Sequence, residues 1–155
     1  MFEAWKNMTT GCLLVGILML PGVTLAESLQ GETQSDLNES AGDQLSQAQQ
    51  QLDSLIAKIQ SHYQDKPLFL GKFEKAQTAW ETFRDAELEA YYPPTEFGDT
   101  FESYGSMYPM CYAGKKQELI ERRIKQLEPW LQGTEEGDIC SGSIKLRDDL
   151  ASGGN

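Results

Sequence analysis

The sequence contains a single histidine, His62, and its three cysteines lie far apart from one another. Sites that use zinc or an activated nucleophile need several such side chains at short spacings, and the chain does not offer them. It also has no glycine-rich phosphate-binding loop. A pair of carboxylates can hydrolyse glycosides, but with 24 acidic residues some pair is inevitable and therefore uninformative. We expect a protein that is not an enzyme and holds no metal or cofactor, with His62 on its surface.

Positive charge is also scarce. The chain has 13 Lys and Arg residues against 24 Asp and Glu residues, which gives a formal net charge of −11. A surface of this sign repels nucleic acids and anionic membranes and attracts cationic proteins. We therefore expect a cationic protein partner and no nucleic acid.

The apolar run over residues 11–23 is too short for a membrane span, which needs about 20 apolar residues. It follows Lys6 and ends in Thr24-Leu25-Ala26, with small residues where a signal peptidase reads them. We predict a cleavable signal peptide over residues 1–26, a periplasmic or secreted protein, and no membrane span in the mature chain. Cys12 opens the apolar run instead of following it, which argues against a lipoprotein.

Loss of the signal peptide leaves Cys111 and Cys140, an even pair in an exported chain. Such a pair predicts one disulfide. We expect it to tie the tail over residues 133–155, rich in Gly, Ser and acidic residues, to the start of the third helix. A bond between two chains is the alternative.

Apolar residues recur every three or four positions in three stretches, which is typical of amphipathic helices. The expected helices lie near residues 35–63, 67–90 and 111–131. Thr33 or Ser35 can cap the first helix, and Pro67 suits the first turn of the second. The short link between these two helices predicts antiparallel neighbours. The expected fold is all-α: a compact three-helix up-down bundle over residues 27–132, followed by a short tail.

The second helix carries an apolar, mostly aromatic stripe. Its members are Phe69, Phe73, Ala76, Trp80 and Phe83. Burying a side chain of this size is worth roughly 1.5 to 3 kcal/mol, so we predict that this helix is central to the core and that Trp80 is buried. We interpret its polar neighbours Arg84 and Asp85 as fixing a helix packing or capping a neighbouring segment, with a binding role as the alternative.

Residues 91–110 form the longest segment without a helical pattern, and they are too rich in Tyr and Phe for a disordered segment. Its aromatic residues either cover the helices or are presented to a partner, and both can hold for different residues. The candidate partner contacts are Tyr92, Glu96, Phe97, Asp99, Phe101, Glu102 and Tyr104.

The stretch Ala76-Gln77-Thr78-Ala79-Trp80, continued by Phe83-Arg84-Asp85-Ala86, resembles the LprI-type lysozyme-inhibitor domain. The likeness covers residues 33 to 128. The residues that carry the family motif are Gln77, Trp80, Arg84, Asp85 and Arg123. The resemblance implies an exported protein that binds and inhibits lysozyme. Such enzymes are commonly cationic, which suits an acidic inhibitor.

A second hypothesis is an envelope structural or adaptor protein. In that case the amphipathic helix over residues 37–63 dimerises or docks into a groove of a partner through its apolar stripe, which includes Leu45 and Leu52. The sequence leaves open whether the protein is a monomer or a homodimer.

Overall fold

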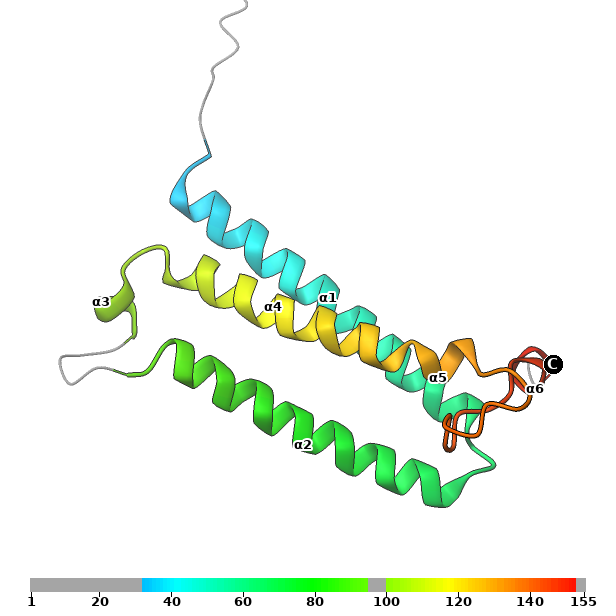
Figure 1. Cartoon of the computed structure of the whole chain (residues 1–155). Helices are drawn as coiled ribbons and strands as arrows, with labels where there is room; N and C mark the ends of the chain where they lie inside the picture. The colour runs from blue at the N-terminus through cyan, green and yellow to red at the C-terminus, as the bar shows by residue number, and fades with distance from the viewer. Residues whose placement is uncertain (1–31, 95–99, 153–155) are drawn as a thin grey trace, which may run out of the picture. The chain divides into compact units, whose positions relative to one another are not determined.

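The computed structural model describes residues 32–94 and 100–152, and the predicted signal peptide lies outside them. The helices are α1 (Gln34–His62), α2 (Pro67–Tyr91), α3 (Thr100–Tyr104), α4 (Tyr108–Leu127), α5 (Pro129–Gln132) and α6 (Arg147–Ser152) (Figure 1). Within these two ranges the only β pairing is an isolated bridge between Thr134 and Leu146. The prediction of an all-α protein is confirmed. Among the described helices, none is long and apolar enough to cross a membrane.

Local signals set most of the helix ends. At the start of α1 the Thr33 hydroxyl accepts a hydrogen bond from the Asp36 N–H at 3.2 Å, and the Asp36 carboxylate accepts one from the Thr33 N–H at 2.8 Å. This reciprocal pair satisfies two N–H groups that a helix start leaves without intrahelical partners. The third long helix starts at Tyr108, earlier than predicted, and stops at Leu127 because Pro129 lacks the N–H that would continue the helix.

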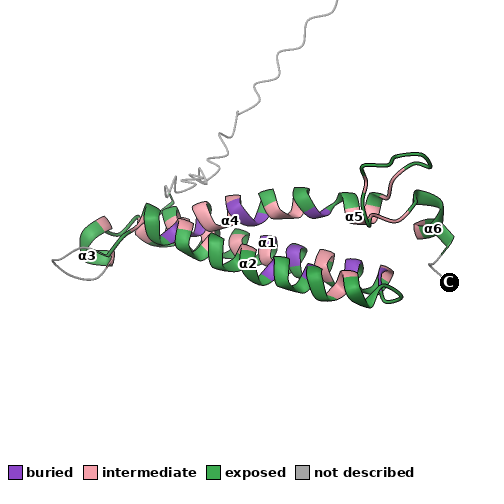
Figure 2. Cartoon of the chain, turned by 60° about the horizontal axis from the view of Figure 1, so that its bottom comes forward, coloured by how far each residue is buried: buried purple, intermediate pink, exposed green. Residues whose placement is uncertain are grey.

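The three long helices do not share the packing equally. Helices α1 and α4 lie side by side along their length, whereas α2 approaches α4 less closely and runs in the opposite direction (Figure 1). The buried face of α1 turns toward α4 (Figure 2). The main core cluster consists of Ala48, Leu52, Ile59, Tyr63, Phe73, Ile120 and Leu127. The centre of the fold is therefore the α1–α4 pair, and the expectation that α2 is the central element is wrong.

The aromatic stripe of α2 is only partly buried. Phe73 is buried and Trp80 is half-buried, but Ala76 is exposed and the Phe83 side chain is 55% exposed. The prediction of a buried Trp80 is thus wrong. The reason is rotational: the buried positions of α2 are Phe73, Gln77 and Leu88, a face turned away from Phe83. Helical periodicity shows that a stripe exists, but the position of α4 decides which part of it is covered.

The C-terminal tail is held without the predicted disulfide. Cys111 and Cys140 are both free and exposed. Cys111 lies in the first turns of α4, and about 24 Å of helix separates it from the end of α4, after which Cys140 follows. A disulfide needs Cα atoms within about 7 Å, and the predicted bond is not found in this structure. Instead, the tail returns to the end of α1, where the Lys145 N–H donates a hydrogen bond to the Tyr63 hydroxyl at 2.9 Å.

Candidate functional site

Tyrosines gather at the end of the domain where α2 stops and α4 starts, and we call this cluster the tyrosine end. Its members are Tyr91, Tyr92, Tyr104, Tyr108 and Tyr112. The Tyr92 ring is central: its centroid lies 5.4 Å from those of Tyr104 and Tyr108, both edge-on, and 6.0 Å from that of Tyr112. Aromatic pairs at these spacings stabilise one another beyond their buried area. The cluster thus joins α2, α3 and α4.

Polar contacts fix the loop that carries this cluster. The Tyr104 hydroxyl donates a hydrogen bond to the Pro93 carbonyl at 2.9 Å, and the Asn38 side chain of α1 donates one to the Ser106 carbonyl at 3.1 Å. Burial raises the pKa of the Tyr92 and Tyr112 hydroxyls, so both stay uncharged at neutral pH. These contacts therefore hold α3 and the start of α4 against the end of α2 and against α1.

The predicted contact residues divide into three groups. Tyr92 and Tyr104 are half-buried within the tyrosine end, so they support the platform. Phe101, 55% exposed, and Glu102 lie on the surface of α3. Glu96, Phe97 and Asp99 lie outside the described residues.

Sequence reasoning missed other residues at this end. Met107, beside the cluster, and Tyr91, one of its members, are each more than half exposed. Tyr108 and Tyr112 face Tyr92 from α4. The four-residue spacing of these two tyrosines was an available signal, because residues i and i+4 share one face of a helix.

The family-motif residues meet between α2 and α4. The Arg123 Nε donates a hydrogen bond to Gln77 Oε1 at 3.2 Å, and the guanidinium carbons of Arg84 and Arg123 lie 5.3 and 5.6 Å from the Trp80 ring centroid. The Arg84 Nε donates to the Asp85 carboxylate at 2.8 Å, and this hydrogen bond lowers the pKa of that carboxyl. The contacts of Arg123 attach α4 to α2, whereas those of Arg84 and Asp85 lie within α2.

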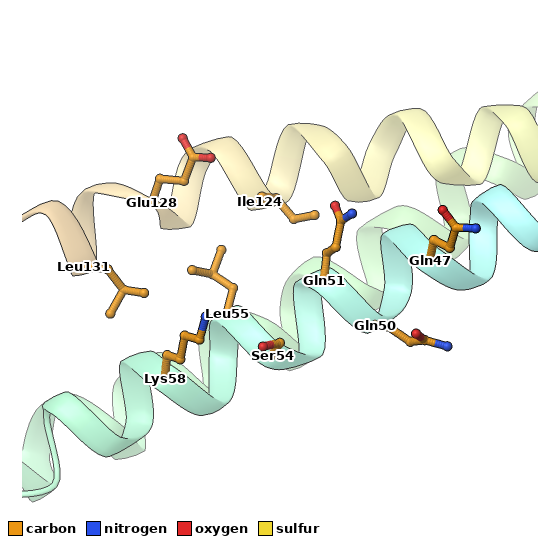
Figure 3. Close-up of a pocket in the computed structure, with 9 residues that line it drawn as sticks. All are labelled: Gln47, Gln50, Gln51, Ser54, Leu55, Lys58, Ile124, Glu128 and Leu131. Carbon is orange, nitrogen blue, oxygen red and sulfur yellow. The ribbon is translucent and has the colours of Figure 1, made fainter.

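Grooves also lie between the elements of the described surface. One of about 490 Å³ lies between α1 and the α4–α5 segment; α1 lines it with three glutamines, Ser54, Leu55 and Lys58, and the facing segment with Ile124, Glu128 and Leu131 (Figure 3). Another, of about 980 Å³, lies between the first turns of α2 and the tail. Among the described residues no group of three or more His, Cys, Asp or Glu side chains could hold a metal ion. At the tyrosine end, by contrast, exposed aromatic residues lie beside rings that pack against one another.

The family comparison gives one match. A family model described as "Lysozyme inhibitor LprI" matches residues 26–127, a region that ends with α4 and leaves out α5, α6 and the tail. No curated protein and no solved structure matches the chain.

Proposed function

The chain belongs to the LprI family of lysozyme inhibitors, and we propose that it is an exported, non-catalytic protein that binds and inhibits a lysozyme through the tyrosine end. The family match carries the proposal at the level of function. The geometry of the tyrosine end supports the choice of surface.

The exposed aromatic and sulfur side chains at this end are suitable interface anchors. Phe101, Met107 and Tyr91 are each more than half exposed, and they stand beside the packed tyrosine rings. Aromatic anchors carry much of the energy of a typical interface, and a fixed backbone reduces the entropy that is lost on binding. We infer that Phe101 and Met107 contact the lysozyme, while Tyr92 and Tyr104 hold them in position.

The charge of the chain fits a cationic partner. The last turns of α2 carry Glu87 and Glu89, and the sequence adds Glu96, Asp99 and Glu102 shortly after them. The ammonium group of Lys115 at this end lies 4.2 Å from the Tyr91 ring centroid and 3.1 Å from the Glu118 carboxylate, which offsets its charge. Complementary charge of this kind mainly raises the association rate and makes it sensitive to salt.

The adaptor hypothesis loses its binding surface. It requires the apolar stripe of α1 to be free, but Leu52 and Ile59 are fully buried and Leu45 packs against the same core. Helix α4 already covers this stripe. Inhibition by the tyrosine end is therefore the function that we propose.

A lysis assay tests the proposal. Bacterial cell walls are digested by several types of lysozyme, with and without the pure protein lacking residues 1–26, and binding is measured in parallel by calorimetry. We expect inhibition of at least one type that increases with protein concentration, and association that slows as salt is added. An equally acidic, unrelated helical protein is the control. If no lysozyme type is bound or inhibited at micromolar protein, the proposal is wrong.

A further inference from the structure

Helix α2 presents a second, mostly apolar surface outside the core and the tyrosine end, whose first half borders the grooves toward the tail and α4. We call it the α2 seam. Its residues are Leu68, Lys72, Ala76, Ala79, Phe83, Ala86 and Ala90. They follow one another at intervals of three or four, and so share one face of the helix. All seven are exposed, with Leu68 at 79% and Phe83 at 55%.

The α2 seam is a continuous surface, unlike the scattered exposed hydrophobic residues that are normal on any protein. Phe83 projects from a helix face that is otherwise built mainly of alanines, so a large side chain stands beside shallow positions. Small residues let a second helix approach closely, and the shallow positions at Ala76 and Ala79 can receive a large side chain. The seam therefore has a large side chain, Phe83, and shallow positions at Ala76 and Ala79 that can receive the same side chain from a second copy.

The charges of α2 indicate what the seam pairs with. Its first half carries Lys72 and Lys75 against Glu74, whereas its second half carries Glu81, Glu87 and Glu89 in addition to the Arg84–Asp85 pair. Two α2 helices that run antiparallel bring the basic half of one onto the acidic half of the other. A parallel pair brings like charges together.

We propose that two copies of this chain associate through the α2 seam as an antiparallel helix pair. With the two-fold axis beside Ala79, each Phe83 lies over Ala76 and Ala79 of the other copy. The same register places Lys72 of one copy opposite Glu87 of the other, twice. Within the described part of the chain neither of these side chains has an ion-pair partner, so both are available.

The arrangement has a consequence for lysozyme binding. Because the tyrosine end lies at the C-terminal end of α2, an antiparallel pair carries its two tyrosine ends on opposite sides of the dimer. Each copy keeps its own lysozyme-binding surface free. Dimerisation and inhibition are therefore separable, and either can fail without the other.

Sedimentation of the protein at micromolar concentration gives the first test. We expect a dimer that Phe83→Asp converts to a monomer while circular dichroism remains helical. Lys72→Glu or Glu87→Lys alone should raise the dimer dissociation constant about tenfold or more, and the double variant should restore it, because two-fold symmetry re-forms both pairs with reversed sign. Lys58→Glu on α1 is the matched control and should change nothing.

Cysteine cross-linking tests the register. In a Cys111→Ser, Cys140→Ser background, the cysteine of Ala79→Cys should form a disulfide with the same cysteine of the second copy. The cysteine of Ala90→Cys should not, because the proposed pairing separates the two positions 90 by about 30 Å. Cross-linking of Ala90→Cys as fast as Ala79→Cys, or a protein that is monomeric throughout, overturns the proposal. A monomer in which Phe83→Asp weakens lysozyme binding also overturns it and assigns the seam to the lysozyme.

Discussion

The domain has an aromatic cluster at each end, and the two differ in what covers them. At the end where α1 turns into α2, which we call the closed end, Tyr63 lies 4.5 Å from Phe69 and 5.9 Å from Trp130 between ring centroids. Tyr63 is fully buried there, and the tail folds over it. At the tyrosine end the rings pack at similar distances but remain half-buried, with Phe101 exposed beside them. Similar ring packing therefore serves as core at one end and as a platform at the other.

The largest expected difference between the ends is in stability. Tyr63→Ala should reduce the free energy of unfolding by about 3 to 5 kcal/mol, because it leaves a cavity in the core and removes two hydrogen bonds. Tyr108→Ala should cost about 1 to 2 kcal/mol, because this ring is partly solvated. Urea unfolding measures both, and equal costs would mean that the two clusters contribute alike to the core.

Removal of a hydroxyl group should separate the ends again, with a smaller effect. The Tyr63 hydroxyl donates to the Trp130 carbonyl and accepts from the Lys145 N–H, so Tyr63→Phe leaves two backbone groups without their partner at the closed end. We expect a loss of about 1 to 2 kcal/mol. Tyr104→Phe frees only the Pro93 carbonyl, on an exposed residue that water can reach, and should cost less than about 0.5 kcal/mol. The reverse order in urea unfolding would contradict this assignment.

Acid should weaken a contact of the tail at the closed end, with the smallest effect of the three. The Lys145 Nζ lies 2.7 Å from the Asp65 carboxylate, and this hydrogen bond lowers the pKa of Asp65 in the folded protein. The contact therefore stabilises the fold above the unfolded pKa of Asp65, and the benefit is lost as the pH falls through the lower, folded pKa. Lys145→Met should reduce the acid dependence of stability slightly by removing the Asp65 contribution, and Lys115→Met should remove the corresponding contribution of Glu118, whose pKa is lowered by its hydrogen bond with Lys115. Thermal unfolding between pH 2 and 7 compares them.

Local chemistry made the helices predictable. The Thr33 cap, Pro67 and the apolar period place α1 and α2 within one residue of their observed ends. The same period cannot separate Phe73, which is buried, from Phe83, which is not, because both belong to one stripe. That distinction depends on where α4 lies, and α4 is distant in the sequence.

Long-range contacts also explain the remaining errors. Cys111 and Cys140 form an even pair in the predicted mature chain, but neither is bonded in the structure, where Cys111 lies in α4 and Cys140 in the tail. From the sequence alone, Tyr104 and Phe101 in the aromatic segment are equally good candidates for partner contact. Only the rings of Tyr92 and Tyr108, which pack on Tyr104, show that it supports the platform while Phe101 remains exposed.

The affinity of Phe101→Ala for the lysozyme identified in the lysis assay tests the central claim most directly. Ile139→Ala, on the tail and 94% exposed, is the control, because it removes an exposed apolar side chain beyond α5. Calorimetric titration should show a dissociation constant raised about tenfold or more for Phe101→Ala and unchanged for Ile139→Ala, with the same unfolding free energy for both variants. Wild-type affinity in the Phe101→Ala protein would contradict the claim that the tyrosine end binds the lysozyme.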